Sequence, residues 1–181
     1  MLKLEELEIK DIKLIEFKNF QDHRGFFQQS YQYDEFSRIG IKNNFIQDNF
    51  SLSKKNVLRG LHYQKKSPQA KLITVITGSI FDVAVDLRKR SPTFGKWVGK
   101  ILSEENNAHI YVPRGFAHGF LSLENNTQVT YKCDNYYDAK DQYGIKWNDP
   151  EIKIDWPSEC EVILSEKDKN LPFIKNIKEF F

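Results

Sequence analysis

The sequence predicts an all-β fold, an antiparallel sandwich or barrel formed by one domain that spans residues 1–181. Three observations support this. Hydrophobic residues alternate with a period of two, several short runs of this kind recur, and turn residues separate them. The chain has no repeat, linker or composition break, and 181 residues fit one domain. With 40% hydrophobic and 14% aromatic residues, it can form a substantial core.

The clearest strand is expected at 81–87, where Phe81, Val83, Val85 and Leu87 alternate with smaller or acidic residues. Such a pattern is typical of a strand with one buried face. Similar runs predict further strands at 71–77, 96–102, 108–113, 119–123 and 128–133. Two short helices are expected. One covers 33–40, with Asp34 near its start and Gly40 at its end, and the other lies in the tail at 171–181.

Charge and cysteine content limit the possible functions. The 27 basic and 25 acidic residues nearly cancel to a net charge of +2, so nothing indicates nucleic-acid binding. The two cysteines, Cys133 and Cys160, are too few for a disulfide framework and lack a zinc-site spacing. Residues 1–17 are too charged for a signal peptide, and no apolar run approaches the roughly 18 residues of a membrane span. A cytoplasmic protein without membrane contact is expected.

Two of the four histidines stand in distinctive settings. His23 and His109 show no motif, and a structural role is the usual expectation for a single histidine. His62 lies in VLRGLHYQ, on a predicted strand, and His118 lies in VPRGFAHGF. In the second segment the P-x-G-x-x-H pattern predicts a tight turn, after which His118 opens a strand and faces the interior.

The P-x-G-x-x-H pattern resembles the second motif of cupins. Metal-binding cupins also have two histidines two residues apart in their first motif. Here that position reads His62-Tyr63-Gln64, so one ligand is missing and no metal site is expected.

Ordered motifs make the resemblance more specific. They are DHRGFFQQSY (22–31), QDNFSLSKKNVLRGLHYQ (47–64), AKL (70–72), FDVAVDLRKRSPTFGKW (81–97), VPRGFAHGF (112–120), YKCDNYY (131–137), GIKWNDP (144–150) and LSEKD (164–168). Over roughly residues 12–170 the chain resembles the dTDP-4-dehydrorhamnose 3,5-epimerase family. The resemblance implies a cupin-type jelly roll, a double-stranded β-helix, with a few short peripheral helices. It implies an isomerase that epimerises C3 and/or C5 of a nucleotide-linked 4-keto sugar without any cofactor.

Epimerisation beside a ketone requires a base, an acid on the opposite face, and a cation at the ketone oxygen. The resemblance assigns the base to His62, oriented by Asp168, the cation to Lys71, and the acid to Tyr131. An unperturbed imidazole titrates near working pH and suits such a base. Without the resemblance, we would expect Lys71 to be an exposed lysine on a strand and Tyr131 to be a packed core residue. Period two places Val129, Tyr131 and Cys133 on one strand face.

The resemblance also implies residues that bind a nucleotide diphosphate sugar. They are Arg24, Phe27, Gln29, Gln47, Asn49, Arg59, His118, Tyr136, Tyr137, Gln142 and Lys167. Arginines suit the diphosphate, and either adjacent tyrosine offers a surface on which a base can stack. A homodimer is implied as well, with N-terminal strands that cross to the partner and RGFF (24–27) near the partner's active site. Gln29 and Gln142 stand where the family usually has glutamate, which leaves the nucleotide and the sugar open.

These departures leave the substrate open, and three rival functions belong to the same fold class. The substrate is a dTDP-linked 4-keto-6-deoxyhexose or a GDP-linked 4-keto-heptose. Epimerisation takes place at C3, at C5 or at both. A 3,4-ketoisomerase of the same barrel class is disfavoured by Tyr63 and Gln64, because those enzymes carry two histidines there. A non-catalytic sugar-nucleotide-binding cupin would have no use for a base and an opposed acid together.

Overall fold

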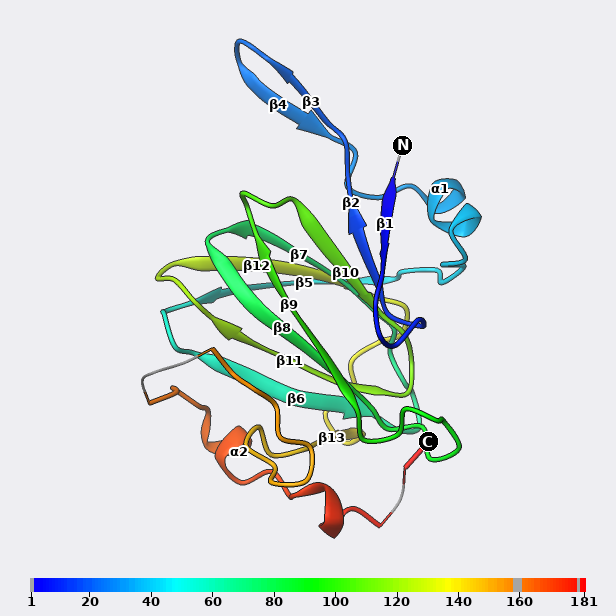
Figure 1. The fold of residues 1–181 in the computed structure, drawn as a ribbon, viewed down its shortest axis with the longest axis vertical. Helices are drawn as coiled ribbons and strands as arrows, with labels where there is room; N and C mark the ends of the chain where they lie inside the picture. Colours follow the sequence, from blue (N-terminus) through cyan, green and yellow to red (C-terminus); the bar gives the residue numbers. More distant parts are fainter. Residues whose placement is uncertain (1, 158–160, 179) are drawn as a thin grey trace.

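A computed structural model describes residues 2–157, 161–178 and 180–181, which form two antiparallel sheets packed face to face (Figure 1). The first sheet has six strands in the order β1-β2-β10-β7-β12-β5. Their bounds are β1 Lys3–Glu6, β2 Lys13–Glu16, β5 Gln47–Ser53, β7 Lys71–Thr77, β10 Ala108–Val112 and β12 Thr127–Cys133.

The second sheet has five strands in the order β13-β6-β11-β8-β9. Their bounds are β6 Leu58–Gln64, β8 Ser79–Asp86, β9 Trp97–Ser103, β11 Phe116–Ser122 and β13 Gln142–Gly144. This arrangement confirms the all-β jelly roll, and the predicted run 71–77 coincides with β7. Among the described residues, no helix has the length and apolar character needed to cross a membrane.

The main core lies between the two sheets. Apolar residues alternate along the strands so that one face of each sheet points inward. The inward set includes Ile73, Val75 and Val129 from the first sheet and Ile80 and Phe120 from the second. This apolar layer fills one part of the interior, and the other part is lined by polar side chains.

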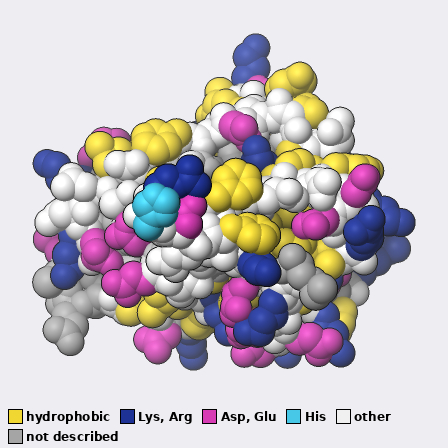
Figure 2. Space-filling view, turned by 90° about the horizontal axis from the view of Figure 1, so that it is seen from above, with side chains coloured by type: hydrophobic (Ala, Val, Ile, Leu, Met, Phe, Trp, Pro, Cys, Tyr) yellow, Lys and Arg dark blue, Asp and Glu magenta, His cyan; other side chains and the backbone are white. Residues whose placement is uncertain are grey.

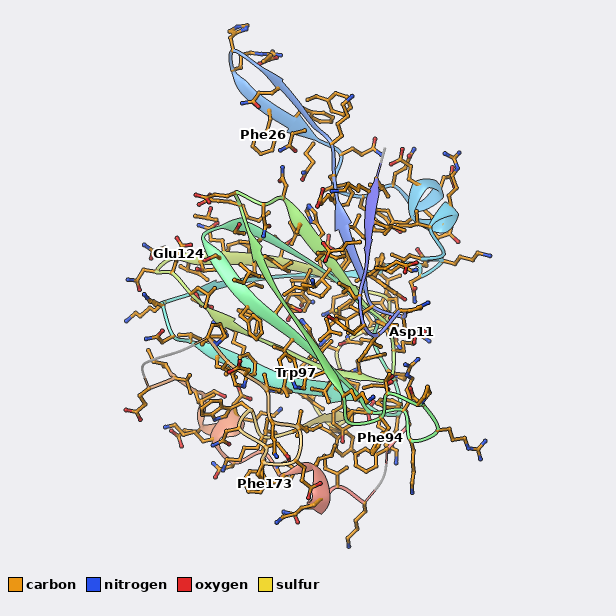
Figure 3. All side chains as sticks on the ribbon, in the orientation of Figure 1. Asp11, Phe26, Phe94, Trp97, Glu124 and Phe173 are labelled. Carbon is orange, nitrogen blue, oxygen red and sulfur yellow. The ribbon has the colours of Figure 1, made fainter. Side chains whose placement is uncertain are left out.

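Strand β8 departs from the sequence prediction in one respect. Phe81, Val83 and Val85 do alternate as expected, but they belong to a second core on the outer face of the five-stranded sheet. There the C-terminal segment covers them, near Phe94, Trp97 and Phe173 in Figure 3. The polar face, with Asp82 and Asp86, is therefore buried too. The alternation predicted the strand correctly, but the strand is buried on both faces instead of one.

Helices are short and peripheral, as predicted. Helix α1, Tyr33–Arg38, lies within the predicted range 33–40 and buries Phe36 against the outer face of the six-stranded sheet. The predicted tail helix at 171–181 is wrong for the described part of that range, which contains only one 3-10 turn, η1 Ile174–Asn176. Its last residue pairs with the segment just after β8, where the Phe181 N–H donates to the Leu87 carbonyl oxygen. Residue 179 lies outside the described residues. A four-residue helix, α2 Glu166–Lys169, precedes the tail.

A hairpin projects from the body of the molecule. It consists of β3 Asn19–Asp22 and β4 Gly25–Gln28, and we call residues 19–28 the arm (Figure 1). Its turn is closed by Asp22, whose carboxylate accepts from the Arg24 N–H at 2.8 Å, and by Gly25 at φ +127°. Gln28 connects the base of the arm to the body by donating to Asn107 at 3.1 Å.

Candidate active site

Two histidines lie side by side on neighbouring strands. His62 of β6 and His118 of β11 are paired in register. Phe116 and Phe120 flank His118 at a spacing of two and belong to the inter-sheet core. Since paired residues of adjacent strands point to the same face, both histidines face the space between the sheets. The sequence prediction that His118 faces the interior is thus confirmed.

His62 is held by a buried carboxylate. Its Nε2 lies 2.6 Å from Asp168 Oδ1, and the Asp168 side chain is only 5% exposed. Helix α2 positions Asp168 because Ser165, its N-cap, accepts from the Asp168 N–H at 3.1 Å. Burial opposes ionisation of Asp168, but the hydrogen bond and the charge of His62 outweigh it, so the Asp168 pKa lies below its usual value. The carboxylate is therefore ionised at neutral pH and accepts a hydrogen bond from Nε2 of the ring.

Lys71 and Tyr131 face His62 from the other sheet. They come from the adjacent strands β7 and β12, and the Lys71 Nζ lies 6.0 Å from the centre of the Tyr131 ring. Burial lowers the pKa of Lys71, while Cys133 and Asp82 act in the opposite direction. Burial also raises the pKa of Tyr131, which keeps its phenol protonated at neutral pH. The arrangement places a proton donor opposite the imidazole.

These groups line two adjoining volumes, which we together call the cavity. A volume of about 450 Å³ is bounded by His62, Lys71, Tyr131 and Asp168, together with Arg59, His118 and Lys167. A second volume of about 330 Å³ shares His62, Lys71 and Tyr131 with it and adds Gln47, Asn49, Tyr137 and Gln142. The three shared side chains therefore lie where the two volumes meet, so a two-part ligand such as a sugar joined to a nucleotide has space on either side of them.

Polar side chains at the cavity edge are held by one another. Tyr137 Oη donates to Gln142 Oε1 at 2.7 Å, and Lys167 Nζ donates to the same oxygen. Gln47 accepts from the Tyr137 N–H and donates to Asn49. Because Gln142 bridges Tyr137 and Lys167, it joins the loop after β12 to helix α2 across the cavity edge.

Arg59 is fixed close to this edge. Its Nε donates to Ser53 Oγ at 3.1 Å, and an NH2 group donates to the Leu52 carbonyl oxygen at 3.2 Å. Both partners are neutral, so the charge of Arg59 is not cancelled by these contacts.

Four residues expected at the site lie elsewhere in this single chain. Arg24 and Phe27 are on the arm, and Gln29 follows it; Arg24 pairs with Asp22 at 2.6 Å and Phe27 is 69% exposed. Gln29 contacts Gln32 instead of the cavity. Tyr136 is 65% exposed and does not line either volume, so Tyr137 is the adjacent tyrosine that reaches the cavity.

Sequence reasoning missed two buried polar residues. Asp82 bonds His118 at 2.8 Å, and Gln64 supports the loop that carries Tyr137 by donating to the Tyr136 carbonyl oxygen and accepting from the Asp138 N–H. The alternation predicted a strand with only one buried face, which left the acidic face of β8 in solvent, so Asp82 was not expected at the site. Gln64 was considered only as a missing histidine. Within the described residues, no group of three or more His, Cys, Asp or Glu side chains could hold a metal ion.

Comparison with known proteins agrees with this geometry. The family model described as dTDP-4-dehydrorhamnose 3,5-epimerase matches residues 6–176. The dTDP-4-dehydrorhamnose 3,5-epimerase of Salmonella typhimurium is 49% identical over 168 residues, covering 92% of each chain. That of Methanothermobacter thermautotrophicus is 49% identical over 159 residues, covering 87% of this chain and 86% of the relative.

A solved structure is also similar. It is the dTDP-6-deoxy-D-glucose-3,5-epimerase of Legionella pneumophila in complex with dTDP-4-keto-L-rhamnose. It has a TM-score of 0.96 and 46% identity, covering 98% of this chain and 95% of that one. Fold and cavity together define a cupin-type jelly roll with a histidine, a lysine and a tyrosine around one internal cavity. Within that class, the chain belongs to the dTDP-4-dehydrorhamnose 3,5-epimerase family.

Proposed function

We propose that this enzyme, an isomerase, epimerises C3 and C5 of a dTDP-linked 4-keto-6-deoxyhexose, with residues 1–181 acting as one cupin domain. The observation that carries the proposal is the placement of His62 and Tyr131 on opposing sheets of one cavity, with Lys71 beside Tyr131. A base and an acid on opposite walls are what inversion at carbon requires. Membership of the family supports the same reaction.

The first step removes a proton from a carbon next to the C4 ketone. Asp168 accepts the hydrogen bond from Nε2 of His62, which leaves the lone pair of Nδ1 to take that proton. The electrons of the C–H bond move to the ketone oxygen and form an enolate. The Lys71 ammonium stabilises the negative charge on that oxygen.

The second step returns a proton from the other side of the ring. The Tyr131 hydroxyl gives its proton to the enolate carbon, the electrons return from the oxygen, and the C4 ketone reforms. The resulting phenolate regains a proton from solvent, and His62 releases its own. The raised pKa of Tyr131 keeps it in the donating form before the step.

The nucleotide diphosphate binds on the positive side of the cavity. Arg59 and Lys167 line the larger volume and carry charge that matches a diphosphate. His118 lines the same volume and contacts the substrate there. Tyr137 lines the smaller volume, where its ring offers a stacking surface for the base, and Gln47 and Asn49 add polar contacts.

The protein acts as a homodimer in which the arm of one protomer reaches the partner's cavity. Arg24, Phe27 and Gln29 have no role near His62 of their own chain, which supports this exchange. Phe26 lies on the side of the arm that faces the body (Figure 3), where it lines a groove with Phe50 and Ile76. Hydrophobic side chains are also visible among charged ones on the face seen in Figure 2. Such exposed aromatic residues suit a protein interface.

A cytoplasmic setting belongs to the proposal, because two cysteines in 181 residues suit a reducing compartment.

A ketoisomerase is not favoured, since the Gln64 side chain already makes hydrogen bonds to the loop that carries Tyr137. Turnover is expected to survive exhaustive chelation, because Gln64 stands where metal-binding cupins have their second histidine, and a requirement for added metal would contradict the proposed mechanism.

The proposal is tested by incubating the protein with 4-keto sugars in D₂O and locating deuterium by NMR. The panel contains a dTDP-4-keto-6-deoxyhexose and its GDP-linked counterpart, together with a GDP-4-keto-heptose. We expect label at C3 and C5 of the dTDP sugar. Label at one carbon only would redefine the enzyme as a monoepimerase, and label in the GDP sugars alone would overturn the choice of nucleotide. Absence of label in every substrate would reject the mechanism.

A further inference from the structure

Asp82 is a carboxylate buried completely in the interior of the protein. It is 0% exposed and lies on β8 between Ile80 and Ala84. Those two neighbours share its strand face and belong to the inter-sheet core. Asp82 therefore points into the space between the sheets, although its sequence pattern resembles a solvent-exposed position.

The hydrogen bonds of Asp82 are incomplete. Its Oδ2 lies 2.8 Å from His118 Nε2, but its Oδ1 is buried without a hydrogen-bond partner among the described residues. An ionised carboxylate that is removed from water and only half satisfied is costly unless a positive charge lies close by. This unpaired oxygen requires an explanation.

Lys71 provides the positive charge. It lines the same cavity as His118, and Asp82 acts on it electrostatically, opposing the effect of burial on the Lys71 pKa. The titratable and charged groups around Lys71 come from four strands and helix α2. They are Arg59 and His62 on β6, Asp82 on β8, His118 on β11, Tyr131 and Cys133 on β12, and Lys167 and Asp168 on α2. At neutral pH the Cys133 thiol is uncharged because burial raises its pKa to about 11. Asp82 is the carboxylate of this set that acts on Lys71 electrostatically.

We propose that Asp82 is a positioning residue that keeps Lys71 protonated and holds His118 with its proton on Nε2. The inference rests on the proposed function, since it concerns the cation that stabilises the enolate. Lys71 must carry its charge before the enolate forms, and a buried amine without a counter-ion loses its proton more readily. Because Asp82 accepts from Nε2, Nδ1 of His118 is left as an acceptor for a substrate hydroxyl.

The test compares Asp82→Asn with the matched variant Asp86→Asn. Both residues are fully buried carboxylates of β8, but Asp86 is bound by Arg88, Ser91 and Thr93 away from the cavity. The reactivity of Lys71 toward an amine-labelling reagent is measured against pH by peptide mass spectrometry. In Asp82→Asn we expect the labelling midpoint to fall by about 1–2 pH units, the effect of one charge at short range in a protein interior.

Turnover gives the second measurement. The alkaline limb of the kcat profile of Asp82→Asn should move down with the labelling midpoint, reducing kcat about tenfold at pH 9. Binding of dTDP should stay within about threefold of the wild type, because Asp82 is buried behind His118. Asp86→Asn should lower the melting temperature and leave the labelling midpoint of Lys71 unchanged.

An unchanged labelling midpoint in folded Asp82→Asn would overturn the inference. Asp82→Thr, whose hydroxyl can still accept from His118, replaces it if the first variant does not fold. If neither folds while Asp86→Asn does, Asp82 is a structural residue and the proposal is rejected. Wild-type protein that labels normally but exchanges no deuterium would refute the proposed function alone, because labelling needs no substrate.

Discussion

The sequence predicts functional residues in both the cavity and the arm, but the structure builds these two regions differently. In the cavity, His62, Lys71, Tyr131 and Asp168 come together within one chain and are held by buried contacts. On the arm, Arg24 and Phe27 are exposed and line neither volume of the cavity. The difference agrees with the proposal that one protomer supplies the groups for proton transfer and that the arm of the second contributes to substrate binding.

Substitution of His62 provides the strongest challenge to this comparison. In His62→Asn we expect kcat to fall about 10³-fold, or about 4 kcal/mol of barrier, because the base is lost. Melting temperature and dTDP binding by calorimetry should change little. Retention of more than a tenth of wild-type turnover would contradict the assignment of His62.

Tyr131 tests the opposite wall of the cavity. Tyr131→Phe removes the donor but leaves the base, so epimerised product should fall about 10²-fold while deuterium exchange from His62 continues. NMR of one reaction mixture measures both. Tyr143→Phe is the control, since Tyr143 stacks on Tyr63 outside the cavity, and it should react like wild type. Equal loss of exchange and inversion in Tyr131→Phe would point to a different donor.

His109 lies at the base of the arm and gives a pH-dependent test. It is buried, and its Nε2 has no hydrogen-bond partner among the described residues. Phe17, just before the arm, packs edge-on against its ring, with the two ring centroids 4.2 Å apart. Burial lowers its pKa to about 4. The unfolded chain therefore binds more protons than the folded one below about pH 6.5, and stability falls as the pH decreases toward 4.

From this shift His109 should cost roughly 2 kcal/mol of unfolding free energy at pH 5 relative to pH 7. Urea titrations of wild type and His109→Phe at both pH values measure it, because the variant lacks the titrating ring. The same loss of stability in both proteins would show that His109 does not titrate in this range.

Arg24 should show the smallest effect and gives the sharpest test of the exchange. Arg24→Ala is expected to raise KM about tenfold and leave kcat within twofold, since a diphosphate contact is lost but the chemistry is not. Mixing it with His62→Asn should restore wild-type KM in part of the sites, because one site of each mixed dimer then has both intact residues. No restoration in verified mixed dimers would exclude the exchanged arm.

Much of the fold was predictable, because alternation reports local structure directly. Val129 and Cys133 are buried and Tyr131 faces the cavity, as period two predicts. The interior position of Asp82 was not predictable, since it depends on the tail covering the other face of β8. The tail itself resembled a helix, but Pro172 and its packing along β8 leave only a 3-10 turn among its described residues.

The candidate site was also predictable from the sequence only in part. Motifs identified His62 and Asp168, although 106 residues separate them in the chain. No local pattern could show that Gln64 supports the Tyr137 loop, because its partners lie in distant segments. The position of Arg24 outside the cavity of its own chain agrees with the exchange of N-terminal strands that the resemblance implies.

The Gln142 bridge has a kinetic consequence. An amide carries no net charge, so it holds Lys167 in place without cancelling the field of the ammonium. Lys167 and Arg59 both line the larger volume, so we expect a substrate with a negatively charged diphosphate to be drawn toward them from solution. The association rate should therefore decline as ionic strength rises, and a carboxylate at position 142 would weaken that attraction even with every contact preserved.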